Sequence, residues 1–96
     1  MADTKEAYLE KLKAKMAEWQ AEIDKLKAQA QQSKAEAKIE LEKRVGDLET
    51  RRQEVEKKMQ ELREASGSAW EDIKAGAQRA WDNLDQAVRS AKEKFK

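Results

Sequence analysis

The chain contains no cysteine, no histidine and no proline, and its 96 residues include only three glycines, three tryptophans, one tyrosine and one phenylalanine. Without cysteine it has no disulfide, no thiolate nucleophile and no thiolate metal site. Without histidine it has no imidazole base and no imidazole metal ligand. The sequence also contains no phosphate-binding loop. We therefore expect a protein that is not an enzyme, with no catalytic residue, no metal and no cofactor.

A large net charge and long apolar runs are absent as well. The 21 basic and 20 acidic residues nearly cancel and are interleaved, whereas a nucleic-acid partner requires a basic patch. The closest candidate, Arg51-Arg52, is followed by Glu54 and Glu56, so we expect no nucleic-acid partner. No apolar run approaches the ~18 residues of a membrane-spanning helix, and the first residues lack the apolar stretch of a signal peptide. The expected location is the cytoplasm.

The abundant residues are those that favour helices. Ala, Glu, Lys, Leu and Arg account for 58 of the 96 residues, a share typical of coiled coils and long helices. Leu, Ile, Val and Phe together number only 14, so the core must be thin, and a small chain with a thin core is marginally stable alone. We expect an all-α protein that forms a single helical domain over residues 1–96, and partner chains become plausible on this ground.

Large apolar residues recur every three or four positions in two groups, over residues 9–26 and 41–62. Such spacing places each group on one face of a helix. At ~100° per residue, both groups fall in the same arc of an unbroken helix, and small residues between them fill that arc. A loop has no reason to preserve this phase. The pattern therefore favours one continuous helix over residues 4–65, roughly 90 Å long at 1.5 Å per residue, in which Gly46 lets another helix come close.

An alternative remains open for the segment between the two groups. The chain could bend near Gln29–Lys34, which would produce a monomeric three-helix bundle. Phase continuity and the helix-forming residues of this segment favour the continuous helix over the bend.

The clearest stop signal in the sequence lies at residues 66–68. Gly67 can adopt the left-handed conformation that ends a helix. Ser68 can then cap a new helix over residues 69–95, and Glu71, three residues later, would complete a capping box. A connection this short makes neighbouring helices antiparallel. The second helix should therefore fold back on the first and form a helical hairpin, or antiparallel coiled coil.

The hairpin has a predicted seam. Folding back aligns residues whose numbers add up to about 132, given the 3.6-residue period of a helix. This register places Trp81 near Arg52, where a guanidinium can lie over an indole. The predicted seam consists of Leu48, Val55, Met59, Leu62, Trp70, Ile73, Trp81, Leu84, Val88 and Phe95.

An apolar stripe near the N-terminus would have no cover within this hairpin. Exposure of seven large side chains would forfeit on the order of 10 kcal/mol, at roughly 1.5–3 kcal/mol for each buried side chain. We therefore expect a homo-oligomer, with a dimer favoured, or another protein to cover the stripe. The stripe consists of Tyr8, Leu9, Leu12, Met16, Trp19, Ile23 and Leu26.

Two segments carry a resemblance to known proteins. They are EAYLEKLKAKMAEWQAEIDKLKAQA (residues 6–30) and ASGSAWEDIKAGAQRAWDNLDQAVRSAKEKF (residues 65–95). Their specific elements are Trp19-Gln20 followed by AEIDKLK, and AWEDIKAG followed by AWDNL. The chain resembles a family of small bacterial coiled-coil proteins linked to stress responses. The resemblance implies a bacterial, cytosolic, non-enzymatic helical protein, and it transfers no catalytic residue.

The leading functional hypothesis is a self-associating coiled-coil protein that binds other proteins, or its own copies, under stress. The alternative is a peripheral lipid- or granule-binding protein whose amphipathic helices lie on an apolar surface. Lys74 and Lys92 flank the apolar face of the C-terminal helix, but Glu71, Asp72 and Asp82 also lie on this helix. An anionic membrane would repel these carboxylates. A membrane partner is therefore less favoured than a protein partner.

Overall fold

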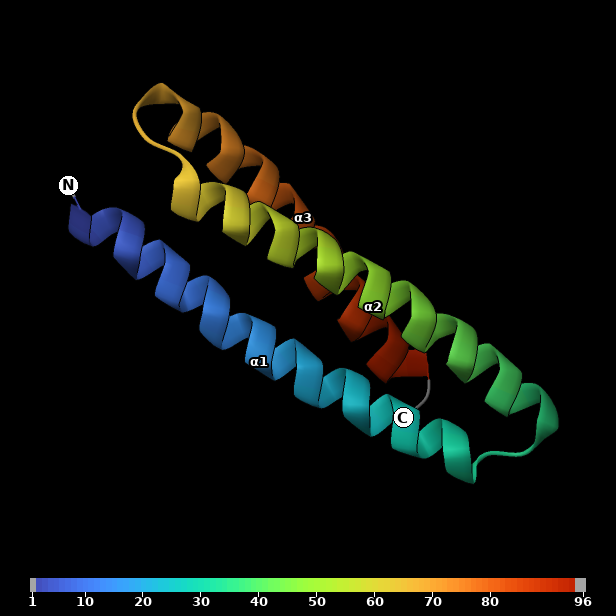
Figure 1. The fold of residues 1–96 in the computed structure, drawn as a ribbon. Coiled ribbons are helices and arrows are strands. Elements are labelled where there is room, and N and C mark those ends of the chain that lie inside the picture. Colours follow the sequence, from blue (N-terminus) through green and yellow to red (C-terminus); the bar gives the residue numbers. More distant parts are fainter. Residues whose placement is uncertain (1, 95–96) are drawn as a thin grey trace.

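The computed structural model describes the backbone of residues 2–94 and the side chains of residues 5–94. In this range the chain forms three helices, α1 (Ala2–Gln32), α2 (Ala35–Glu64) and α3 (Ser68–Lys94). They run up, down and up as a slender bundle (Figure 1), with overall dimensions of 51 × 18 × 18 Å. The all-α prediction is confirmed.

The prediction of one helix over residues 4–65 is wrong. α1 ends at Gln32 and α2 begins at Ala35, and the longest dimension of 51 Å is far shorter than the expected helix. The chain bends at Ser33–Lys34, at the end of the segment that the alternative proposed, and forms the three-helix arrangement. Folding back lets the two in-phase stripes bury one another within one chain. This burial outweighs the local preference for helix because packing, rather than propensity, supplies most of the stability of helices in proteins.

Local geometry at this bend shows few stop signals. The Ser33 amide donates to the carbonyl of Ala30 at 3.1 Å, and the Ser33 hydroxyl donates to the carbonyl of Gln29 at 2.8 Å. Lys34 is extended, with φ −90° and ψ 152°, and its side chain makes no capping hydrogen bond. A lysine at this position also places a positive charge at the positive end of the α2 dipole. Helix packing, not capping, therefore holds the bend.

The second turn is built differently. Gly67 has φ +61°, the left-handed conformation in which residues with a Cβ atom are strained. α3 begins at Ser68 itself, and the Trp70 amide donates to the Gly67 carbonyl at 3.3 Å. Within the described residues, neither Ser68 nor Glu71 makes a side-chain hydrogen bond, so the predicted capping box does not form. Ser68 lies inside the first turn of α3 instead of before it, where a cap would have to lie.

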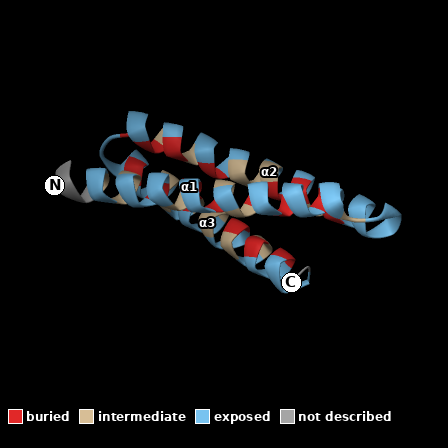
Figure 2. Ribbon diagram, turned by 90° about the horizontal axis from the view of Figure 1, so that it is seen from below, coloured by how far each residue is buried: buried red, intermediate tan, exposed pale blue. Residues whose placement is uncertain are grey.

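α2 and α3 pack antiparallel, close to the predicted register. The Lys58 side chain lies over Gly76, and Glu40 forms an ion pair with Lys94, so the numbers of facing residues add up to 134. Buried residues lie on the faces that the three helices turn toward one another (Figure 2). Among the described residues this core contains no buried polar or charged residue.

The three-dimensional setting of two glycines predicts opposite effects of alanine. Gly67→Ala should lower the free energy of unfolding by about 1–2 kcal/mol, because it forces a Cβ atom into the left-handed region. Gly46→Ala should raise it by roughly 0.5–1 kcal/mol, because glycine is a poor residue for a helix interior. A Cβ atom at Gly46 meets no other atom within 4 Å, so the close helix approach expected there is absent. Urea unfolding followed by tryptophan fluorescence measures both changes.

Ser68→Ala is the matched control for the turn. It should leave the free energy of unfolding unchanged within about 0.5 kcal/mol, because the Ser68 side chain caps nothing. A loss of 1 kcal/mol or more in this variant would contradict the assignment of the helix start.

Candidate functional site: the groove that holds the first helix

The apolar stripe of α1 faces the other two helices. Leu12, Met16, Trp19, Ile23 and Leu26 are buried, with Leu12 and Ile23 fully inaccessible to solvent. Tyr8 and Leu9 are half-buried at the start of the same stripe. The expectation that this stripe lacks cover within one chain is therefore wrong. Because the bend folds α1 back onto α2, the apolar surface of the stripe is already buried within one chain, and it no longer argues for a second copy.

The walls of this groove come from α2 and α3, and they contain nearly all of the residues predicted for the hairpin seam. Ile73 and Trp81 are half-buried against the core. Phe95 lies outside the described residues. The buried members of the seam are Leu48, Val55, Met59, Leu62, Trp70, Leu84 and Val88. Together with α1 they form one continuous apolar core.

Four aromatic rings meet between α1 and α3. Trp19 and Trp81 pack edge to face with their ring centroids 5.4 Å apart. Tyr8 packs edge to face on Trp70 at 6.2 Å and lies 6.5 Å from Trp81. Such pairs contribute about 0.5–1.5 kcal/mol beyond their buried area. The cluster therefore joins α1 to α3, the pair of helices with the least extensive contact.

The stacking of the Arg52 guanidinium on Trp81, which the register suggested, is not among the cation–π contacts of the described residues. Trp81 turns toward α1, where Trp19 supplies its main aromatic contact. The Arg52 guanidinium instead donates to the Gln20 side chain of α1 at 2.6 Å and pairs with Glu56 at 3.1 Å. The predicted hairpin contained only α2 and α3. In the three-helix bundle, α1 contacts both Trp81, through Trp19, and Arg52, through Gln20.

A lysine completes the aromatic cluster. The Lys74 ammonium lies 5.0 Å from the Trp70 ring centroid and 5.3 Å from that of Tyr8, within the range of a cation–π interaction. The Tyr8 hydroxyl donates to the Gln78 side chain at 3.3 Å. The indole N–H groups of Trp19 and Trp70 are buried without a hydrogen-bond partner among the described residues. An unpaired buried donor costs stability, so the groove is well filled but polar atoms in it remain unsatisfied.

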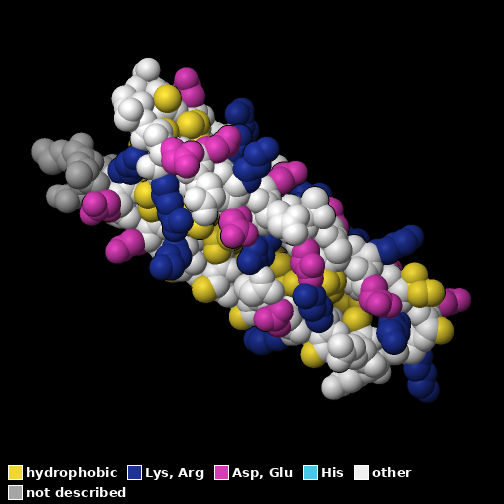
Figure 3. All heavy atoms as spheres, in the orientation of Figure 1, with side chains coloured by type: hydrophobic (Ala, Val, Ile, Leu, Met, Phe, Trp, Pro, Cys, Tyr) yellow, Lys and Arg dark blue, Asp and Glu magenta, His cyan; other side chains and the backbone are white. Residues whose placement is uncertain are grey.

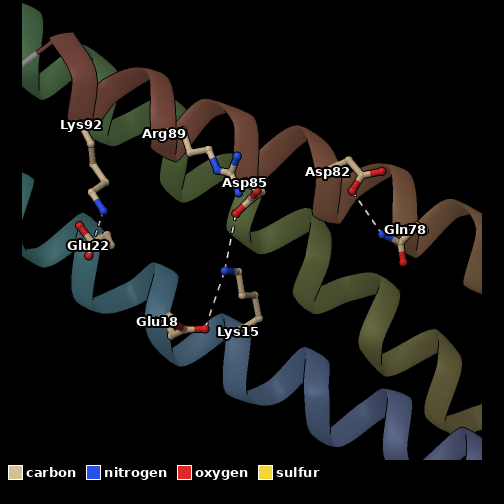
Figure 4. Close-up of polar contacts among 8 residues, drawn as sticks. All are labelled: Lys15, Glu18, Glu22, Gln78, Asp82, Asp85, Arg89 and Lys92. Atoms are coloured by element: carbon tan, nitrogen blue, oxygen red, sulfur yellow. Dashed lines mark hydrogen bonds and ion pairs between the residues drawn. The ribbon is translucent and has the colours of Figure 1, made fainter.

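Charged side chains border the groove and join α1 to both of its neighbours. Lys15 lies 3.6 Å from Asp85, and Lys92 lies 3.6 Å from Glu22, both pairs joining α1 to α3 (Figure 4). Lys27 pairs with Glu49 of α2 at 2.6 Å. Exposed ion pairs of this kind contribute only about 0–1 kcal/mol each. Their main effect is to select the register in which α1 lies in the groove.

One lysine of α1 also caps α2. The Lys5 ammonium donates to the carbonyl of Ala65 at 2.6 Å and to that of Arg63 at 3.3 Å. These carbonyls lie at the C-terminal end of α2, where a cation interacts favourably with the helix dipole. Sequence reasoning did not identify the contact of Lys5 with the end of α2 or that of Gln20 with Arg52, because the partners lie at least 32 positions apart. Only the three-helix register would have revealed them.

Two carboxylate–lysine pairs shift the pKa values of their members. The hydrogen bond with Glu49, and then its charge, raise the pKa of Lys27. The hydrogen bond with Lys94, and then its charge, lower the pKa of Glu40. Both shifts stabilise the charged forms and leave neither group suited to proton transfer near neutral pH.

The described residues contain little else that supports chemistry. Among them, no three or more acidic side chains gather where a metal ion could bind. None of the helices in the same range has a stretch apolar enough to cross a bilayer. Charged side chains of both signs are interspersed over the face seen in Figure 3, with apolar atoms visible between them. What this arrangement can do is hold an amphipathic helix between two others.

The Tyr8 hydroxyl gives the groove a measurable pH dependence. Partial burial raises the pKa of Tyr8 above its ordinary value of 10.0, and the Asp82 charge raises it further. The folded state therefore binds this proton more tightly than the unfolded chain. The resulting stability is complete below pH 10.0 and is lost as the pH rises through the folded-state pKa. Tyr8→Phe should reduce the alkaline loss of stability, measured by urea unfolding between about pH 9 and 11.

Lysine titration is common to the wild type and the variant, so the difference between them isolates Tyr8. Asp82→Asn should reduce the same loss in part, because it removes only the second cause. Identical alkaline slopes for wild type and Tyr8→Phe would contradict a raised Tyr8 pKa.

Comparison of the chain with models of protein families, with curated proteins and with solved structures gives no match. The resemblance to bacterial stress-response coiled-coil proteins therefore stays a prediction.

Proposed function

We propose that this chain is a non-enzymatic helical protein that binds amphipathic helices, either of other proteins or of its own copies. One observation carries the proposal. α1 packs its apolar stripe into the core that it shares with α2 and α3, yet it is joined to them by a two-residue connection that contains no glycine and whose Lys34 side chain makes no capping hydrogen bond. The groove between α2 and α3 is therefore a helix-binding site that α1 occupies in the closed molecule.

The groove defines the chemistry of its partner. Its floor is apolar, from Leu41 to Leu62 on α2 and from Trp70 to Ala91 on α3. Its borders carry charges of both signs, with Glu49 on α2 and Asp85 and Lys92 on α3. A fitting partner is an amphipathic helix with apolar residues at three- and four-residue spacing and lysines beside them. α1 meets this description, and an exposed helix of a partly unfolded protein also would.

A role under stress and a cytoplasmic location complete the proposal. Both rest on the sequence, through the resemblance and through the residue pattern. Heat weakens the docking of α1 and also unfolds other proteins, so the groove would open when partner helices become available. Such a site needs no catalytic group and no cofactor.

A lipid surface is the less favoured partner. The apolar faces of all three helices are turned inward, so binding to lipid would require the whole bundle to open. Lys74 and Lys92, which flank the apolar face of α3, are engaged with α1, over Tyr8 and beside Glu22. An amphipathic helix could offer aromatic rings and carboxylates to these lysines as well as apolar side chains to the core, whereas the interior of a bilayer offers only apolar contacts.

The test uses the full chain and a fluorescent peptide of residues 2–32. Trp19→Ala should weaken the docking of the chain's own α1 by about 3–5 kcal/mol, the usual cost of removing a buried Trp side chain. The peptide should then bind at least about tenfold more tightly to this variant than to the wild type, since 1.4 kcal/mol corresponds to a factor of ten. Fluorescence anisotropy of the peptide measures the binding.

Ile39→Ala is the matched control, because Ile39 is 59% exposed and lies outside the core. It should bind the peptide no better than the wild type. Equal binding by Trp19→Ala and Ile39→Ala would argue against a helix-binding groove. Binding of the wild type to anionic vesicles, with a blue shift of tryptophan emission, would favour the lipid alternative.

A further inference from the structure

We propose that the helix which enters the groove in trans is α1 of a second copy, delivered when residues 33–34 straighten and join α1 and α2 into one helix. The proposal rests on the helix-binding groove of the proposed function and names its occupant. The product is a two-fold symmetric dimer in which each chain holds the α1 helix of its partner.

The connection itself opposes the bend. Lys34 is extended in the bend, but neither Ser33 nor Lys34 has the positive φ that would make conversion to helix costly, because Gly67 alone has a positive φ in the described range. Around the connection the sequence AQAQQSKAEAK (residues 28–38) consists almost entirely of good helix formers. In the bend the carbonyls of Gln29 and Ala30 accept from Ser33, but the first amides of α2 and the last carbonyls of α1 lack their i→i−4 helical partners. Straightening pairs these backbone groups with one another.

Phase makes the straightened helix useful. Ala30 is 3% exposed on α1 and Leu41 is 1% exposed on α2, so both face the same core. In an unbroken helix at ~100° per residue, the eleven steps from Ala30 to Leu41 would turn about three full turns plus ~20°. The two side chains would therefore point in nearly the same direction. The straightened helix therefore presents one continuous apolar stripe. Its N-terminal half projects beyond its own α2–α3 hairpin and needs a second hairpin to cover it.

The register supplies the two-fold axis. Paired residues of α1 and α2 have numbers that add up to 70 for Lys5 and Ala65, 72 for Gln20 and Arg52, and 76 for Lys27 and Glu49. Half of each sum falls between 35 and 38, directly beside the connection. Two straightened chains placed antiparallel about an axis at this point reproduce every one of these contacts between chains. Domain exchange of this kind is an inexpensive route to a symmetric dimer.

The contacts of α1 with α3 transfer in the same way. Asp85 and Lys92 stay on the α3 of one chain and meet Lys15 and Glu22 of the other. The α2–α3 hairpin remains within each chain, because Gly67 at φ +61° is a true helix stop. Residues 31–40 contain no buried residue in the closed molecule, and in the dimer two of these segments lie side by side.

Concentration decides between the two forms. The closed molecule holds its own α1 at the millimolar effective concentration typical of a short linker. The dimer gains the helical hydrogen bonds at the connection but must be formed by two molecules. Exchange should therefore appear after unfolding and refolding at high protein concentration, and it should be slow to reverse because α1 must leave the groove.

The experiment distinguishes contacts within a chain from contacts between chains. Unlabelled and ¹⁵N-labelled chains are unfolded together, refolded at about millimolar concentration, separated by gel filtration and cross-linked with carbodiimide. In the dimer fraction, the Lys27–Glu49 and Lys92–Glu22 cross-links should join peptides of mixed isotope. The Lys94–Glu40 cross-link should join peptides of one isotope only, because that ion pair connects α2 and α3 of the same chain.

Two variants change the connection in opposite directions. Ala35→Pro places proline at the first position of α2, where it is favoured, after a residue whose extended conformation suits it. It preserves the closed bundle but breaks the straightened helix, so it should lower the dimer fraction about tenfold or more. The double variant Ser33→Ala with Lys34→Ala should raise that fraction, because both changes favour helix.

Several results would overturn the exchange. They are a dimer whose Lys27–Glu49 cross-links carry one isotope only, a dimer fraction unaffected by Ala35→Pro, and no dimer of the Ser33→Ala, Lys34→Ala variant at millimolar concentration. None of them would contradict the groove itself, because binding of the free α1 peptide to Trp19→Ala does not require the connection to straighten. Circular dichroism of Ala35→Pro verifies that the variant is folded.

Discussion

The fold depends on the insertion of one apolar stripe, that of α1, between α2 and α3. Trp19 is the centre of this contact, 2% exposed and edge-on to Trp81 of α3. Without the stripe of α1, α2 and α3 would form a two-helix hairpin whose apolar side chains facing α1 would be exposed to water. The bend at residues 33–34, the ion pairs along the groove and the Lys5 cap on α2 all follow from the place that α1 takes. Burial of the stripe contributes most of the stabilisation that holds α1 in place, and each polar contact contributes little.

The two connections in the chain have different physical origins. At residues 65–67 the local sequence and the tertiary structure agree, because Gly67 adopts a conformation that ends a helix at low cost. At residues 33–34 they disagree, because the sequence favours helix and packing imposes a bend. Natural sequences usually keep local and global preferences consistent. An inconsistency of this kind marks the place where a second arrangement lies closest in free energy.

This inconsistency also explains how far the sequence could be interpreted. The helical class, the positions of the apolar stripes and the glycine turn follow from periodicity and from Gly67, which are local properties. The α2–α3 register was predicted to within about two residues, because apolar stripes of an antiparallel pair can align in few ways. The bend near Gln29–Lys34 was predicted only as the alternative, since Ser33 and Lys34 carry no stop signal that would favour it. Because the continuous helix was favoured, the contacts that α1 makes through Lys5, Gln20 and Trp19 were missed.

In the exchange that we propose, the contacts found within one chain form between two. The core holds no buried polar or charged residue among those described, and such a core does not distinguish an α1 that arrives from its own chain from one that arrives from another. The ion pairs fix the direction and register of α1 in the groove, but Lys27 meets Glu49 in either case. The two arrangements differ only at the Ser33–Lys34 connection, which is bent in the closed molecule and would be straight in the proposed dimer. The choice between the closed molecule and the proposed exchanged dimer would thus depend on these two residues, while the rest of the sequence specifies the groove.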